Sequence, residues 1–268
     1  MKRTRLWLII LISFFTSNSF AQTTDTGRYY TSFDNTKIYY EVNGNGYPVV
    51  LIHGFCGTGD GWKKGILYNN LLKGGYKVIL LDLRGNGKSD KPHTDAAYGN
   101  DAEAKDIIGL MTSLNIKKYN VVGYSRGSII ASRLLILDDR VNKTVLGGMG
   151  DGFTDPQWPR RLHAYATLMG SKKFHEFDDM MKYIHSENFD IPALAMQQKH
   201  QPTTSRAELS KITKPVLIIK GSEDKENGSE VGLQRLIPGS RLSYVPGDHN
   251  TASKNNQFSA GVFFFFQY

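Results

Sequence analysis

Short apolar segments with little polar alternation recur along the chain. They are residues 47–54 (YPVVLIHG), 76–85 (YKVILLDLRG), 119–125 (YNVVGYS), 141–148 (VNKTVLGG) and 214–221 (KPVLIIKG). Runs of this kind are typical of strands buried on both faces, as in a parallel sheet. Two earlier segments, residues 28–32 and 37–42, are joined by a polar FDNT turn and predict a β-hairpin.

Helical patterns lie between these segments. Residues 101–114 place Ala104, Ile107 and Met111 on one face, and residues 128–137 are mostly apolar, as in a helix packed against a sheet. Strands that alternate with helices predict an α/β fold with a mostly parallel central sheet flanked by helices. In such folds ligands bind beyond the carboxyl ends of the strands.

The alternation stops between residues 150 and 211. Three helical segments follow one another there, at residues 156–170, 172–188 and 192–200. We therefore predict a small helical cap, residues 150–211, inserted into a core made of residues 22–149 and 212–268. The chain ends in FSAGVFFFFQY, which predicts a final helix with a buried aromatic face.

The first 21 residues have a different pattern from the rest of the chain. The basic residues Lys2, Arg3 and Arg5 precede an apolar run at 6–15, and the small residues Ser19 and Ala21 follow. This pattern predicts a signal peptide over residues 1–21 and an exported protein, periplasmic or secreted. The apolar run is shorter than the roughly 20 residues of a membrane span. An uncleaved anchor is the alternative.

Composition and charge narrow the class of protein. With 40% hydrophobic and 22% charged residues, the 268-residue chain can fold around a large core. The net charge is +8, but the lysines are scattered without a basic aromatic face, which argues against nucleic-acid binding. The single cysteine, Cys56, cannot form an internal disulfide. No histidine spacing predicts a metal site, no cofactor is expected, and the oligomeric state stays open.

One serine stands where a predicted strand turns directly into a helix. Ser125 lies in NVVGYSRGSIIASRLL, with Gly123 two residues before it and Gly127 two residues after it. Such a corner strains the backbone, and side chains two positions away on either side would clash, so glycine is required. The corner presents the hydroxyl at the helix N-terminus, where the helix dipole favours negative charge.

Five segments in chain order give the sequence a family resemblance. They are LIHGFCGTGDGW, DLRGNGKSDKP, GYSRGS, IIKGSED and PGDHN. From residue 28 to the C-terminus the chain resembles the α/β-hydrolases, whose nucleophile elbow matches GYSRGS. The resemblance implies that Ser125 is the nucleophile, Asp224 the acid and His249 the base. It also implies an oxyanion hole made of the backbone N–H groups of Phe55 and Arg126.

Two adjacent carboxylates, Glu223 and Asp224, are candidates for the acid that faces His249. Neighbouring residues that leave a strand point in opposite directions, so only one of them can face His249. The family pattern places the acid three residues after a glycine, here Gly221, which favours Asp224.

Residues near these motifs have further predicted roles. We expect His53 to orient the oxyanion loop and Asp82 to pair with Arg84. For the Arg126 side chain we favour a structural ion pair over attraction of an acidic substrate. Candidates for the substrate pocket, with core packing as the alternative, are Cys56, Met149, Phe153 and Trp158.

The motifs also separate reaction classes within the family. Ser125 argues against epoxide hydrolases and haloalkane dehalogenases, which resemble the chain but require an aspartate nucleophile. The loop HGFCG departs from the HGGPG of proline iminopeptidases. The sequence therefore predicts a carboxylesterase-like serine hydrolase that cleaves a small-molecule ester through an acyl-enzyme. A lactonase, a thioesterase, a C–C bond hydrolase and a slow-turnover ligand receptor are the alternatives.

Overall fold

The computed structural model describes residues 27–268, so the predicted signal peptide lies outside the described residues. The described residues form an eight-stranded sheet in the order β1-β2-β4-β3-β5-β6-β7-β8. Strand β2 is antiparallel to β1 and β4, and the other neighbouring pairs are parallel, which confirms the predicted hairpin and mostly parallel sheet. The strands are β1 (Arg28–Thr31), β2 (Lys37–Asn43), β3 (Pro48–Ile52), β4 (Lys77–Leu81), β5 (Tyr119–Tyr124), β6 (Val141–Gly147), β7 (Val216–Gly221) and β8 (Arg241–Val245).

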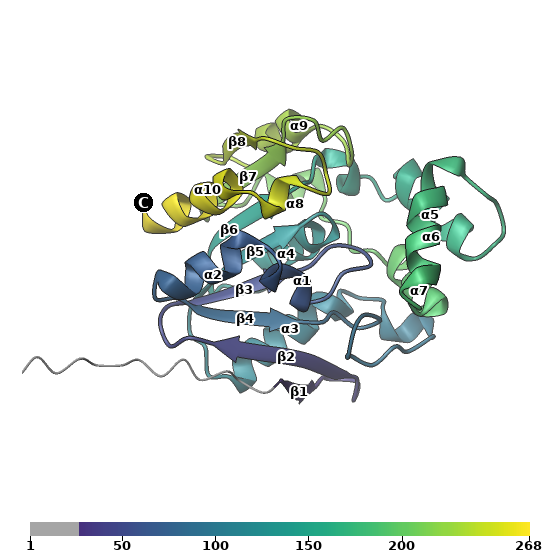
Figure 1. Ribbon diagram of the computed structural model, residues 1–268, viewed down its shortest axis with the longest axis horizontal. Helices are drawn as coiled ribbons and strands as arrows, with labels where there is room; N and C mark the ends of the chain where they lie inside the picture. The colour runs from purple at the N-terminus through teal and green to yellow at the C-terminus, as the bar shows by residue number, and fades with distance from the viewer. Residues whose placement is uncertain (1–26) are drawn as a thin grey trace, which may run out of the picture.

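Helices flank this sheet on both sides (Figure 1). One hydrophobic cluster joins the sheet to α3 and α4, and a second joins it to α2 and α10. The helices are α1 (Asp60–Lys63), α2 (Ile66–Lys73), α3 (Ala102–Ser113), α4 (Arg126–Leu137), α5 (Pro159–Leu168), α6 (Asp178–Ser186), α7 (Ile191–Lys199), α8 (Arg206–Leu209), α9 (Glu230–Leu236) and α10 (Asn256–Gln267).

Strand β3 shows why the apolar segments lack alternation. Val50 and Ile52 point into the cluster on the α3 and α4 side, whereas Val49 and Leu51 point into the cluster on the opposite face. All four side chains are fully buried. Burying each of them favours folding by about 1.5–3 kcal/mol, so apolar burial on both faces stabilises the central strands.

Helices α5, α6 and α7 lie together to one side of the sheet, apart from the layers that flank it (Figure 1). They fall within the predicted insertion at residues 150–211. A separate hydrophobic cluster holds them to the loop after β3, and it includes Cys56, Leu168, Ile184 and Leu194. We refer to α5, α6 and α7 as the cap helices; the exact boundaries of the insertion stay a prediction.

The C-terminal helix α10 corrects one expectation. Phe265 and Phe266 are buried in the cluster on the α2 side, but Phe264 is 60% exposed. Four consecutive residues of a helix span about 300° around its axis, so an unbroken aromatic run cannot lie on one face. Within residues 27–268, no helix has the length and apolar character needed to cross a bilayer.

Candidate active site

Ser125 occupies the sharp corner between β5 and α4, in a strained backbone conformation with φ 53° and ψ −124°. A Cβ atom added to Gly123 would overlap the carbonyl of Gly127. A Cβ atom added to Gly127 would overlap the carbonyl of Ile52 on β3. Both glycines are therefore required by close backbone contacts, and one of these contacts comes from a neighbouring strand.

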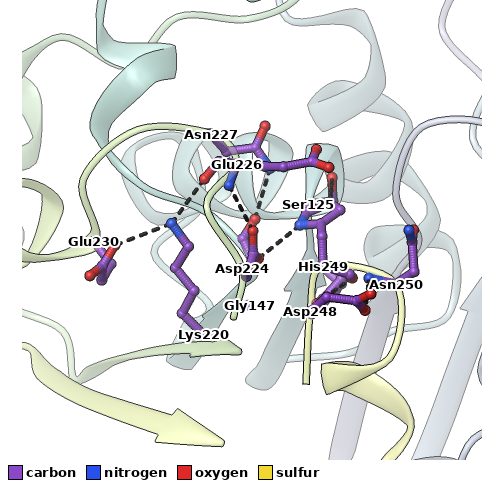
Figure 2. Close-up of polar contacts among 12 residues, drawn as sticks. Ser125, Gly147, Lys220, Asp224, Glu226, Asn227, Glu230, Asp248, His249 and Asn250 are labelled. Carbon is purple, nitrogen blue, oxygen red and sulfur yellow. Dashed lines mark hydrogen bonds and ion pairs between the residues drawn. The ribbon is translucent and has the colours of Figure 1, made fainter. Parts of the chain in front are cut away.

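The loops after β7 and β8 bring two further side chains to Ser125 (Figure 2). The Nε2 atom of His249 lies 2.9 Å from Ser125 Oγ, and its Nδ1 atom lies 2.8 Å from Asp224 Oδ2. Because the carboxylate accepts a hydrogen bond, Nδ1–H donates to Asp224 and Nε2 is left to accept from the serine hydroxyl. The side chain of Asp224 is fully buried, whereas Glu223 is exposed, so the carboxylate that faces His249 is the predicted one.

A buried lysine that sequence reasoning missed holds the loop of Asp224. Lys220, at 2% exposure, donates from Nζ to the carbonyls of Glu226 and Gly228 and to the carboxylate of Glu230. The amide of Glu226 in turn donates to Asp224 Oδ1 at 2.9 Å. Figure 2 shows Lys220, Glu226 and Glu230 with Asp224 and His249. A lysine within the apolar segment KPVLIIKG was the available signal, because a buried ammonium requires partners.

Tyr124, the residue before Ser125, steadies the histidine loop. Its hydroxyl donates to the carbonyl of His249 at 2.7 Å, and the two rings lie 5.5 Å apart. Burial raises the pKa of Tyr124, which keeps the phenol protonated and able to donate. The contact joins the ends of β5 and β8 across the sheet.

His53 and Asp82 order the loop after β3. The amide of Leu83 donates to His53 Nε2 at 3.0 Å, and His53 Nδ1 lies 2.8 Å from the carbonyl of Gly54. Burial lowers the pKa of His53, consistent with a neutral ring that donates from Nδ1. Asp82 accepts from the amide of Gly59 at 2.7 Å. These bonds agree with the orienting role predicted for His53.

The predicted pairing of Asp82 with Arg84 is wrong. The Arg84 guanidinium is fully buried and forms ion pairs with Asp34, in the turn after β1, and with Asp106 on α3. Asp82 instead accepts from the backbone amides of Gly59 and Lys88. Both carboxylate partners of Arg84 are distant in sequence, so only the packing of β1 and α3 brings them to it.

The two residues whose backbone amides are predicted to form the oxyanion hole both lie close to Ser125. Arg126 follows the serine in sequence, and Phe55 follows Gly54, where an added Cβ atom would lie 3.2 Å from Ser125 Cβ. Across residues 27–268, neither amide donates a hydrogen bond to another protein group. The Arg126 side chain forms a buried ion pair with Glu103 at 2.5 Å, which confirms its predicted structural role.

A cavity of about 90 Å³ opens beside Ser125. Of the four predicted pocket residues, Met149 and Trp158 line it. Phe153 and Cys56 do not, which corrects the prediction. Phe153 is 1% exposed in the main core, and Cys56 packs against the cap helices, where burial raises its thiol pKa to about 12.

Polar side chains of the cap and of the loop after β7 complete the wall of this cavity, and sequence reasoning missed them. Helix α5 contributes Arg160 and Arg161, α7 contributes Gln198, and Gln201 and Glu226 come from adjoining loops. The sequence carries no signal for them, because the docking of the cap decides which helix face meets Ser125.

Among residues 27–268, no group of three or more His, Cys, Asp or Glu side chains is arranged to hold a metal ion.

Comparison with known proteins matches this geometry to a family. Residues 47–171 match the family model for the alpha/beta hydrolase fold. A 2-hydroxy-6-oxononadienedioate/2-hydroxy-6-oxononatrienedioate hydrolase of Cupriavidus pinatubonensis is 30% identical over 223 residues, which cover 71% of this chain and 75% of that protein. The chain belongs to the α/β-hydrolase family.

Other similar proteins are named for different activities. A putative non-heme chloroperoxidase of Synechocystis sp. is 44% identical over 111 residues, which cover 41% of this chain but only 39% of that protein. The structure of an esterase from Exiguobacterium antarcticum superposes with a TM-score of 0.75 at 26% identity, covering 91% of this chain and all of that chain. The family and these relatives support hydrolase activity without deciding which bond is cleaved.

Proposed function

We propose that the protein is a serine hydrolase that cleaves an ester-type bond of a small molecule through an acyl-enzyme. Ser125 is the nucleophile, His249 the general base and Asp224 the acid that orients it. The observation that carries this proposal is the continuous series of hydrogen bonds from Asp224 Oδ2 through His249 to Ser125 Oγ.

The steps follow from this geometry. His249 Nε2 takes the hydroxyl proton as Ser125 Oγ attacks the ester carbonyl, and it then returns that proton to the leaving alcohol. The buried Asp224 keeps the imidazole in the required tautomer and stabilises its charged form. The backbone amides of Phe55 and Arg126 donate to the oxyanion of the tetrahedral intermediate. Water, activated by the same histidine, then releases the acid.

The size of the cavity favours a short acyl group. Its volume of about 90 Å³ is well below the roughly 300–1,000 Å³ of sites that take drug-sized ligands. Within an ester series, we therefore expect turnover to fall as the acyl chain lengthens.

A C–C bond hydrolase is the second candidate, and it rests on the relative from Cupriavidus pinatubonensis. Lactonases and thioesterases need the same three side chains and are separated from esterases by substrate panels. A slow-turnover ligand receptor would not need Asp224, His249 and Ser125 to be joined by hydrogen bonds. Sustained turnover of any ester would argue against such a receptor.

A labelling experiment tests the nucleophile. A fluorophosphonate probe should label the wild-type protein, and Ser125→Ala should abolish both the labelling and the hydrolysis of p-nitrophenyl acetate. Removal of such a nucleophile lowers turnover by about 10⁶-fold. Ser210→Ala is the matched control, because Ser210 is exposed at the end of α8 and its hydroxyl donates only to the carbonyl of Ala207. Labelling that persists in Ser125→Ala would contradict the assignment.

A further inference from the structure

The cavity beside Ser125 contains more positive than negative charge. Three arginines line it, Arg126, Arg160 and Arg161, against one carboxylate, Glu226. Two of these cations are matched by acids. Arg126 pairs with the buried Glu103, and Arg160 pairs with Glu226 at 2.5 Å. The charge of the third arginine therefore decides the electrostatic character of the cavity.

Arg161 has hydrogen bonds but no carboxylate partner. Its Nη1 donates to the carbonyls of Gln198 and Lys199, and its Nη2 donates to the carbonyl of Pro156. Within residues 27–268 no carboxylate lies within ion-pair distance of it. Asp155 attracts it only from further away. The cavity thus carries one cation that no acid in contact with it neutralises.

The bonds of Arg161 also leave donors available. A guanidinium has five N–H groups, and three carbonyl bonds leave one N–H on Nε and one on Nη2. The three carbonyls come from the end of α7 and the loop before α5, so two segments of the chain hold the guanidinium in place. A planar carboxylate can accept two parallel N–H bonds from such a group.

Arg161 is also partly buried. Desolvation lowers its pKa, although an arginine in a protein stays charged near neutral pH. A partly buried cation without an acid partner loses hydration that an entering anion would replace. We propose that the substrate carries a carboxylate that pairs with Arg161 while its ester lies against Ser125. This rests on the proposed hydrolase function and specifies the class of its substrate.

Matched pairs of esters test the proposal. On the acyl side, mono-p-nitrophenyl esters of succinate, glutarate and adipate are compared with neutral p-nitrophenyl esters of equal carbon number. On the alcohol side, 4-acetoxybenzoate is compared with phenyl acetate. The wild-type enzyme should prefer the anionic member on at least one side, after subtraction of the uncatalysed rate.

Substitutions assign that preference to Arg161. Arg161→Gln should reduce the anionic-to-neutral ratio of kcat/KM by about 10- to 100-fold, the effect of losing hydrogen bonds to a charged group. Arg161→Lys keeps the charge and should retain part of the preference. Arg235→Gln removes the same charge from α9, outside the cavity, and should leave the ratio unchanged.

A purely structural role at the end of α7 predicts a different result. Arg161→Gln would then slow both members of each pair equally, and the unchanged ratio would overturn the proposal. The absence of any anionic preference in the wild type would do the same.

Calorimetric binding of monomethyl glutarate separates this proposal from the proposed function, since it needs no turnover. Ser125→Ala should bind this acid, and the double variant Ser125→Ala with Arg161→Gln should not. Equal binding by both would exclude the subsite, whereas lack of ester turnover alone would count against the hydrolase assignment.

Discussion

At the scale of single residues, the strain at Ser125 is the clearest feature of the site. A serine with φ 53° is disfavoured by about 1–3 kcal/mol relative to an ordinary conformation. Its own amide donates to the carbonyl of Gly147 at 2.8 Å, and the Ser128 hydroxyl donates to the same carbonyl and to that of Gly123. These contacts lock the corner and hold the hydroxyl toward His249.

The neighbouring carboxylates Glu223 and Asp224 provide a matched pair of substitutions. Asp224→Asn should lower ester hydrolysis by about 10⁴-fold, because the amide favours the wrong histidine tautomer. Glu223 is exposed, so Glu223→Gln should change the rate by less than about tenfold. Steady-state rates with p-nitrophenyl acetate make the comparison. The reverse order of effects would assign the acid to Glu223.

At the scale of elements, the short helix α8 is tied to the helix that follows Ser125. Ser205 and Glu208 form a capping box at its N-terminus, and Glu208 also pairs with Arg133 on α4 at 2.9 Å. Although partial burial opposes ionisation, the bonds from Arg133 and Ser205 lower the pKa of Glu208 to about 2. The pair therefore helps to anchor the segment that leads from the cap back to β7.

This lowered pKa predicts a pH-dependent stability. The Glu208 contribution is present above its ordinary pKa of 4.5 and is lost as the pH falls toward about 2. Glu208→Gln should lower the free energy of unfolding at pH 7 by about 0.2–1 kcal/mol, the range of a solvent-screened ion pair. Urea unfolding at pH 7 and pH 3 measures the difference, which should shrink at the lower pH.

The control for this prediction is Glu187→Gln. Glu187 is exposed at the end of α6, and its side chain makes no ion pair or hydrogen bond among residues 27–268. It should show little effect at either pH. An effect of Glu208→Gln that is equally large at both pH values would mean that the carboxylate charge is not responsible.

At the scale of the whole molecule, ion pairs and hydrogen bonds connect the cap to the sheet domain around the site. Arg160 on α5 pairs with Glu226, whose amide holds Asp224. Arg126 beside Ser125 donates to the carbonyl of Gln197 on α7. The cap helices are therefore bonded to both the acid loop and the nucleophile corner, and they set the shape and charge of the cavity.

The cellular location of the protein depends on its N-terminal segment. We propose export, with cleavage after Ala21, on the basic, apolar and small-residue pattern at its start. Protein recovered from the periplasm or the medium should begin at Gln22 when its N-terminus is sequenced. An intact Met1 on membrane-bound protein would indicate an anchor instead.

Much of the fold and the position of Ser125 could be predicted from the sequence, because their causes are local. A strand buried on both faces requires consecutive apolar residues, as in VVLI at 49–52. The strand-to-helix corner requires Gly123 and Gly127 around Ser125. Resemblance to a family then supplied Asp224 and His249, which the structure brings to the serine.

Only the tertiary structure decided which distant side chains meet. Arg84 selects Asp34 and Asp106 rather than Asp82, and Phe153 lies in the core rather than in the cavity. The same holds for Arg161, whose carbonyl partners belong to another helix and a loop. A local pattern specifies which face of an element is apolar. Partners and cavity walls depend on how whole elements dock, and that is set by packing over the entire molecule.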